Sequence, residues 1–274
     1  MASTPPPTDE MRVKAVTRLV GDLEQGFRDA VKRSLHFALD GSVTSLAIVD
    51  HYLEQARTEE RAPILALLAA GAGAYFGELV RRELGGLWIG DGSDPRHLRL
   101  LLTSEFAYFS PADVAFAAIL GEDPDPDDPR TPPGVPLDIS IHLRNTTQPP
   151  PNPRRVDDPN DPPPDAPDAV DAVDAVDAAD AADAADAADA ADAADLAGAV
   201  TELPPLPYDD GSDDASWIAA RLAELAPVPA DQFYSLTTRY ETLELILALL
   251  ASRRALGGYE PYVYTVQDYL HAFS

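Results

Sequence analysis

The chain has no cysteine, and its 274 residues include only two methionines and two tryptophans. Without thiols it has neither a disulfide framework nor a thiolate metal site, which agrees with a reducing compartment. The most apolar uncharged stretch, Ala62 to Gly77, covers 16 residues, fewer than the roughly 20 that cross a bilayer. The first residues show neither the basic start nor the apolar core of a secretory signal. We therefore expect a cytoplasmic protein that does not enter a membrane.

Basic residues are scarce, because 20 Lys and Arg stand against 47 Asp and Glu and give a formal charge of −27. The imbalance is local. Residues 156–214 contain 19 of the acids and no Lys or Arg, which leaves 28 acids against 20 bases in the rest of the chain. So acidic a background argues against direct nucleic-acid binding, while the remaining sequence is only mildly acidic.

The most biased segment is an Ala-Asp repeat that carries an aspartate at every third position from Asp165 to Asp195. On an α-helix these charges would spiral round the axis and leave no apolar stripe to pack. Each Asp pair at i,i+3 would also oppose the helix by roughly 0.2–0.5 kcal/mol. A proline-rich stretch precedes the repeat. We expect residues 145–202 to be a linker that is disordered or loosely helical.

The run from Arg61 to Gly86 is the segment that is apolar enough to be buried on nearly every side, and it predicts a central helix. Its glycines, above all Gly71, Gly73 and Gly77, would let another helix or strand approach closely. Each glycine lowers helix propensity by roughly 1 kcal/mol, so close packing is the expected compensation.

Local patterns predict the other elements around this helix. The expected helices are 8–32, 42–57, 110–120, 213–226 and one from 230 or 236 to 256; the expected strands are the hairpin 87–89 with 98–103, an edge strand 137–143 on that hairpin, and 262–266. Together they predict an α+β fold, a helix-dominated single domain with a small antiparallel sheet. Its core comprises residues 8–144, with a Pro/Asp-rich loop at 122–136, and 203–274.

Two side chains are candidates for chemistry. Glu78 interrupts the most apolar helix, where burial would raise its pKa and suit acid or base catalysis, although Arg82 four residues on can simply pair with it. His51 lies three residues before Glu54 on the second helix, a spacing that metal sites use, but a solvated helix face explains the pair better. The remaining histidines, serines and glycines match no catalytic, phosphate-binding or metal motif, so no cofactor and no metal are expected.

The stretches DGSVTSLAIVDHYL and GAYFGELVRRELGGLWI resemble small uncharacterised bacterial domains over roughly residues 40–120. The resemblance implies a compact α+β module and brings no catalytic residues with it. The Ala-Asp repeat is similar to slippage-expanded low-complexity sequence of high-GC bacteria.

The leading hypothesis is a non-catalytic accessory, regulatory or immunity-type protein that binds a protein partner, with the acidic segment either attracting a basic partner or serving only as a spacer. The expected partner surface consists of Trp88, Tyr259, Tyr262, Tyr264 and Tyr269, although ordinary packing would explain these tyrosines equally well. The alternative is an enzyme of unrecognised class that uses Glu78 as acid or base.

Overall fold

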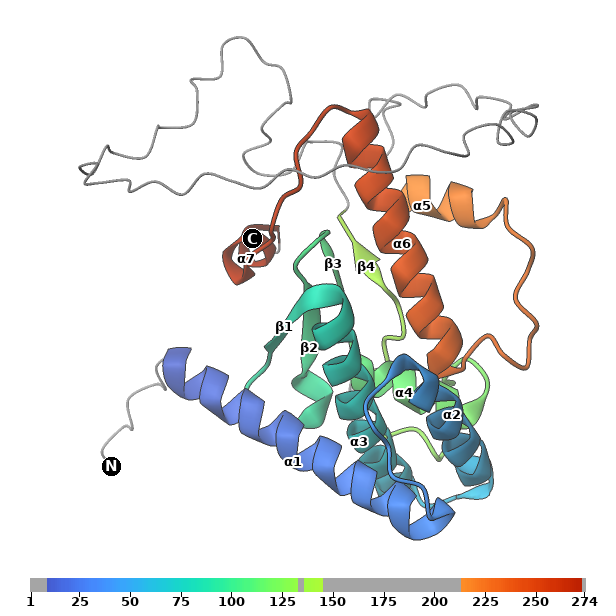
Figure 1. Cartoon of the computed structure of the whole chain (residues 1–274). Coiled ribbons are helices and arrows are strands. Elements are labelled where there is room, and N and C mark those ends of the chain that lie inside the picture. Colours follow the sequence, from blue (N-terminus) through green and yellow to red (C-terminus); the bar gives the residue numbers. More distant parts are fainter. Residues whose placement is uncertain (1–8, 133–135, 145–212, 273–274) are drawn as a thin grey trace, which may run out of the picture.

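The structure is a computed structural model that describes residues 9–132, 136–144 and 213–272. In chain order (Figure 1) its elements are α1 (Asp9–Leu35), α2 (Leu46–Gln55), α3 (Ala62–Val80), β1 (Gly86–Ile89), β2 (Arg99–Leu102), β3 (Ala107–Phe109), α4 (Pro111–Leu120), β4 (His142–Leu143), α5 (Asp214–Leu222), α6 (Leu236–Leu256) and α7 (Val266–Ala272). Short helical turns occupy Val43–Ser45, Ala56–Thr58, Arg81–Gly85 and Pro95–His97. The strands form one antiparallel sheet in the order β1-β2-β3-β4. The predicted helix-dominated α+β fold with a small antiparallel sheet is confirmed.

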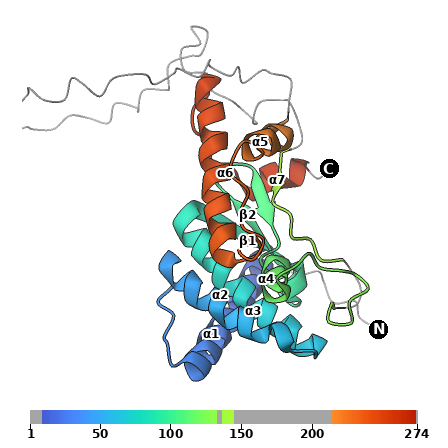
Figure 2. The same cartoon turned by 90° about the vertical axis from the view of Figure 1, so that its right-hand side faces the viewer.

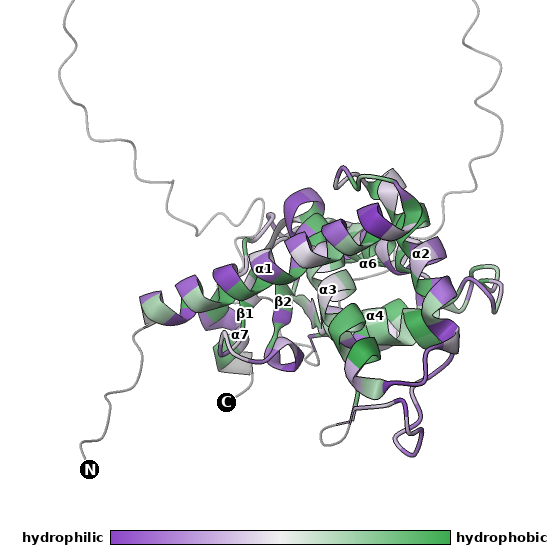
Figure 3. Ribbon diagram, turned by 90° about the horizontal axis from the view of Figure 1, so that it is seen from below, coloured by the Kyte–Doolittle hydropathy of each residue, from purple (hydrophilic) through white to green (hydrophobic). Residues whose placement is uncertain are grey.

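Helix α3 lies at the centre, with α1 and α4 packed against it (Figures 1 and 3). Gly73 brings α4 close, because a Cβ at this position would lie 2.6 Å from the carbonyl oxygen of Pro111. The prediction that this helix is buried on nearly every side holds from Ala69 to Gly77. It is wrong for the first turns, where the side chains of Ile64 and Leu67 are 40% and 68% exposed.

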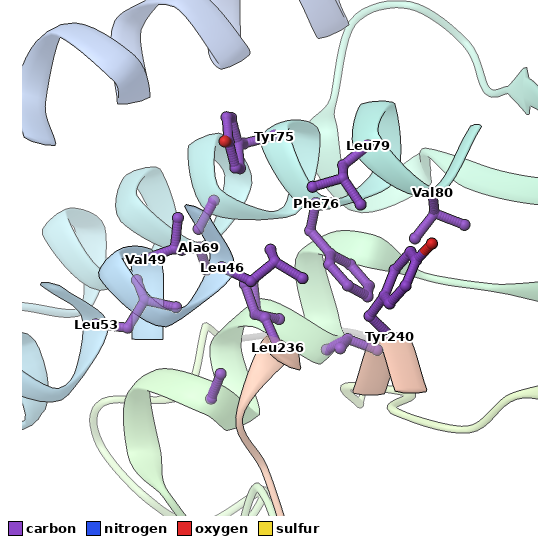
Figure 4. Close-up of a cluster of buried hydrophobic side chains, with 14 of the residues drawn as sticks. Leu46, Val49, Leu53, Ala69, Tyr75, Phe76, Leu79, Val80, Leu236 and Tyr240 are labelled. Atoms are coloured by element: carbon purple, nitrogen blue, oxygen red, sulfur yellow. The ribbon is translucent and has the colours of Figure 1, made fainter. Parts of the chain in front are cut away.

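The core is built from side chains of α1, α2, α3, α4 and α6 and of strands β2 and β3. Figure 4 shows Leu46 of α2, Phe76 of α3 and Leu236 and Tyr240 of α6 pointing toward one another. Residues on both sides of segment 145–212 therefore pack in the same apolar cluster. The expected linker and the Ala-Asp repeat lie outside the described residues.

The junction between α2 and α6 is fixed by a side chain that caps the later helix. The Asp50 carboxylate accepts hydrogen bonds from the backbone N–H of Leu236 at 2.7 Å and from that of Thr237 at 3.1 Å. Two donors at the start of α6 are thereby satisfied from a residue far away in the sequence. Helix α6 then runs along the fold, with α2 near its first turns and α5 near its other end (Figure 2).

The predicted hairpin is confirmed as β1 and β2, in which Trp88 lies opposite Leu100. Strand β3 was not predicted, because it has only three residues. The expected strand 137–143 shrinks to β4, which pairs with β3 rather than with the hairpin. Part of the reason is that the backbone N–H of Asp138 bonds to the Asp113 carboxylate at 3.1 Å and is thus not available to a ladder.

The strand predicted at 262–266 is wrong. The backbone N–H of Tyr264 donates a hydrogen bond of 2.8 Å to the carbonyl of Thr103, residues 262–265 form no strand, and the chain then enters α7. The Asp268 carboxylate accepts from the backbone N–H and the hydroxyl of Thr265 at 2.7 and 2.8 Å. This capping of the first turn by the Asp268 side chain starts a helix where the apolar alternation suggested a strand.

Among the described residues, one helical stretch, Ala62–Gly85, is long and apolar enough to cross a membrane by length and composition. Two thirds of its most apolar window (67%) is buried inside the protein. Buried core helices have this same composition, and α3 occupies such a position here.

Candidate functional site

Glu78 is held by an arginine and a tryptophan. Its carboxylate accepts from Nε and Nη2 of Arg81 at 3.0 and 2.7 Å and from the indole Nε1 of Trp88 at 3.1 Å. The expected partner Arg82 instead donates to the backbone carbonyl of Gly41. Burial opposes ionisation of Glu78, but the bonds from Arg81 and Trp88 outweigh it and lower its pKa. The premise of a raised pKa is therefore wrong, and Glu78 is a positioned anion.

Trp88 also has a structural role, because its side chain packs between two elements of the fold. The indole ring fills the space that Gly77 leaves on α3, since a Cβ at Gly77 would overlap the ring and touch Pro111. The ring thereby ties β1 to α3 and is half-buried. This part of the expected partner surface faces mainly inward.

Replacing Glu78 by Gln should test this role. We expect the free energy of unfolding to fall by about 1 kcal/mol at neutral pH, because one charge-assisted contact is lost while its shape is kept. A group whose pKa is lowered in the folded state stabilises above its unfolded pKa, so the difference from the wild type should vanish in acid. Urea titrations followed by tryptophan fluorescence measure it, and an equal loss at acid and neutral pH would contradict it.

His51 lies away from Glu78, in a polar hollow of about 400 Å³ between α2 and the start of α6. Its ring Nε2 lies 2.9 Å from the side-chain nitrogen of Gln55, and Glu54 pairs with Arg57 at 3.6 Å. The described part of the chain contains no group of three or more His, Asp or Glu side chains that could hold a metal ion.

The four tyrosines separate into two kinds. Tyr264 and Tyr269 are buried against Phe106, whose ring stacks on that of Tyr269 with centroids 4.2 Å apart. Tyr259 and Tyr262 are half-buried. Tyr264 and Tyr269 are therefore not part of the expected partner surface. For these two residues the alternative given by the sequence, ordinary packing, is the one observed.

An apolar groove lies between α1, α2 and α3. It has a volume of about 370 Å³ and is lined by Leu23, Phe27, Tyr52, Ile64, Leu67 and Leu68, with Asp22 and Arg33 among its polar side chains. Leu67 also lines a second hollow of about 210 Å³ beside α4. The exposed start of α3 is thus a ridge with an apolar depression on each side.

A second unexpected feature is a group of charges that are buried or, for Asp214, half-buried. We call it the stem cluster, and it consists of Glu105, Arg144, Asp214, Arg253 and Arg254. The Asp214 carboxylate accepts from Arg144 Nε at 3.3 Å and from Arg253 Nη1 at 3.1 Å. Glu105 forms an ion pair with Arg254. Since Arg144 ends one described segment and Asp214 lies at the start of the next, the cluster holds together the two places where residues 145–212 join the fold.

Burial dominates the electrostatics of this cluster. It raises the pKa of Glu105 to about 7, even though the neighbouring Arg254 favours ionisation. It also raises the pKa of Asp214, against the attraction of Arg144 and Arg253. The cost of desolvating a carboxylate can exceed the Coulombic gain from an adjacent guanidinium. This holds for both Glu105 and Asp214.

Neither the groove nor the stem cluster was predicted from the sequence. The exposed side chains of the groove belong to a helix whose composition predicts burial, and two arginines in the last turn of a helix, such as Arg253 and Arg254, usually complement the helix dipole. One usable signal was present, because Arg144 and Asp214 carry opposite charges at the two borders of the biased segment. Comparisons of this chain with protein-family models, with curated proteins and with solved structures find no match.

Proposed function

We propose that this protein is a non-catalytic interaction protein that binds another protein through the α1–α3 groove. The supporting observation is the exposure of Ile64 and Leu67 on a helix that is otherwise the core of the fold. Contiguous exposed apolar surface around a depression is typical of protein-binding sites. An accessory or immunity-type role in the cytoplasm of a bacterium is part of the same proposal.

The occupant that fits best is an amphipathic helix of a basic protein. A groove between two helices accepts apolar side chains spaced along one face of a third helix. Asp22 and Arg33 lie eleven positions apart on α1, about 16 Å along its axis, and a complementary helix would place a base opposite Asp22 and an acid opposite Arg33. The formal charge of −27 would steer a basic partner toward the protein and raise its association rate.

Replacing Leu67 by Glu should weaken such binding at least tenfold while leaving the fold intact. The side chain is exposed, so the change has little effect on stability, but it puts a charge on the apolar ridge of the groove. Met11 on α1 offers a matched control, because it is 61% exposed and does not line the groove. Met11→Glu should bind like the wild type.

The experiment places a photo-crosslinking amino acid at position 67 or 11 of the full chain and exposes it to an extract of the native host. The crosslinked segment is then made as a peptide, and its affinity for each variant is measured by calorimetry. We expect a basic, amphipathic helical segment that is captured from position 67 alone. Equal capture from both positions, or affinity within twofold after Leu67→Glu, would refute the groove as the binding surface.

A further inference from the structure

The hollow beside α4 is a cavity of about 210 Å³ that four separate segments of the chain line. Helices α3 and α4 lie side by side there (Figure 3). They contribute Ala66, Ala69 and Phe116, while the turn at 94–96 and Leu137 supply other walls. Leu67 lines the hollow too and is 68% exposed, so a small molecule can enter without opening the fold.

The walls of this hollow suit an aromatic ring. The side chains of Ala66 and Ala69 are single methyl groups, so they leave the space beside them open. Phe116 is 2% exposed, and aromatic rings pack well against one another when offset or edge to face. An apolar cavity of roughly 150 Å³ stays dry and binds benzene. The hollow therefore has room for one ring with a small substituent.

Two carboxylates held by backbone contacts supply hydrogen-bond acceptors to the hollow. Asp113 is 4% exposed, and its carboxylate accepts from the backbone N–H of Asp138 at 3.1 Å. The Asp94 carboxylate accepts from the backbone N–H of Arg96 at 2.9 Å. Each carboxylate oxygen can accept more than one hydrogen bond, so both acids keep acceptor capacity. With two acids and one arginine among its lining residues, the hollow favours a ligand that donates and disfavours an anion.

We propose that this hollow binds a small aromatic molecule, a single ring that carries a hydroxyl or N–H donor. The ring packs against Phe116, and the donor bonds to the carboxylate of Asp113. The site shares Leu67 with the α1–α3 groove, but their other lining residues differ. The proposal does not depend on protein binding in the groove and is tested without a protein partner.

Three ring compounds of similar size test the chemistry of the site. Each is titrated into the full-length protein and followed by the NMR shifts of the backbone amides. We expect para-cresol, which is neutral and donates through its hydroxyl, to bind saturably with a Kd below about 1 mM. Toluene lacks the donor and should bind about threefold more weakly. The anion para-toluate should bind about tenfold more weakly than para-cresol.

Replacing Ala66 by Leu tests the location, because the larger side chain would occupy the hollow from α3. Ala66 is half-buried, so the fold has room for the change, and the affinity for para-cresol should fall about tenfold. Ala62→Leu is the matched control. It makes the same substitution one turn earlier on α3, at a half-buried position that does not line the hollow. Its affinity should stay within about twofold of the wild type.

The amide shifts also report where the compound binds. Saturable shifts at Ala69 and Phe116 support the site, whereas shifts confined to Ala30 and Gly71, which line the α1–α3 groove, would overturn it. The absence of saturable binding, equal affinity for para-cresol and para-toluate, or an unchanged affinity in Ala66→Leu would do the same. If Ala66→Leu did not fold, the three compounds and the shifts of the wild type would still decide the question.

Discussion

Replacing Gly73 by alanine should lower the free energy of unfolding by about 2 kcal/mol, although alanine is the better helix former by roughly 1 kcal/mol. The added methyl group would lie 2.6 Å from the carbonyl oxygen of Pro111 and 2.7 Å from the backbone nitrogen of Ala112. Backbone atoms cannot rotate away as a side chain can, so α3 and α4 must separate along their contact. Thermal unfolding followed by circular dichroism should show a Tm lower by roughly 4–8 °C.

Gly21→Ala provides the matched control. Gly21 lies within α1, and a Cβ there would meet nothing within 4 Å. This variant should gain up to about 1 kcal/mol from helix propensity alone. If both substitutions changed stability in the same direction, the close approach of α4 would not be what excludes a side chain at Gly73.

Replacing Asp214 by alanine should reduce stability by about 3 kcal/mol. The variant takes one carboxylate away from Arg144 and Arg253, whose side chains are both buried. Removing one member of a buried ion pair is strongly destabilising, because the charge left behind has lost both water and its counter-ion. Urea unfolding at neutral pH measures the loss.

The control is Asp231→Ala, which removes an exposed acid and changes net charge equally. Its effect should stay within about 0.5 kcal/mol. A loss below 1 kcal/mol in Asp214→Ala would mean that the two arginines find adequate partners elsewhere and that the stem cluster does not depend on this carboxylate.

Much of the fold was predictable where the signal is local. The turn residues between Trp88 and Leu98 specify a hairpin whatever surrounds it. Proline at the first position of α4 and Gly121 after its end mark both limits of that helix. The strand expected at residues 262–266 is not present, because alternation over five residues fits an extended segment that leads into a helix as well as it fits a strand.

The candidate site was less accessible, since its features depend on contacts between distant segments. The lowered pKa of Glu78 results from Arg81 and Trp88 together, and only the fold decides which arginine turns toward the carboxylate. Likewise, Leu67 is as apolar as Leu65, yet one is exposed and the other buried. Composition gives the average burial of a helix, whereas the positions of its neighbours decide which face stays open.

The stem cluster also bears on how the Ala-Asp repeat can vary. For a flexible linker such as the sequence predicts, the entropic cost of closing the chain between Arg144 and Asp214, which lie 3.3 Å apart, would grow only with the logarithm of the linker's length. Each doubling adds about 0.6 kcal/mol, less than many single substitutions in a core. Copies of the three-residue unit could therefore be gained or lost in evolution at little cost to folding. The stability of the rest of the protein would then depend very little on the number of repeat units.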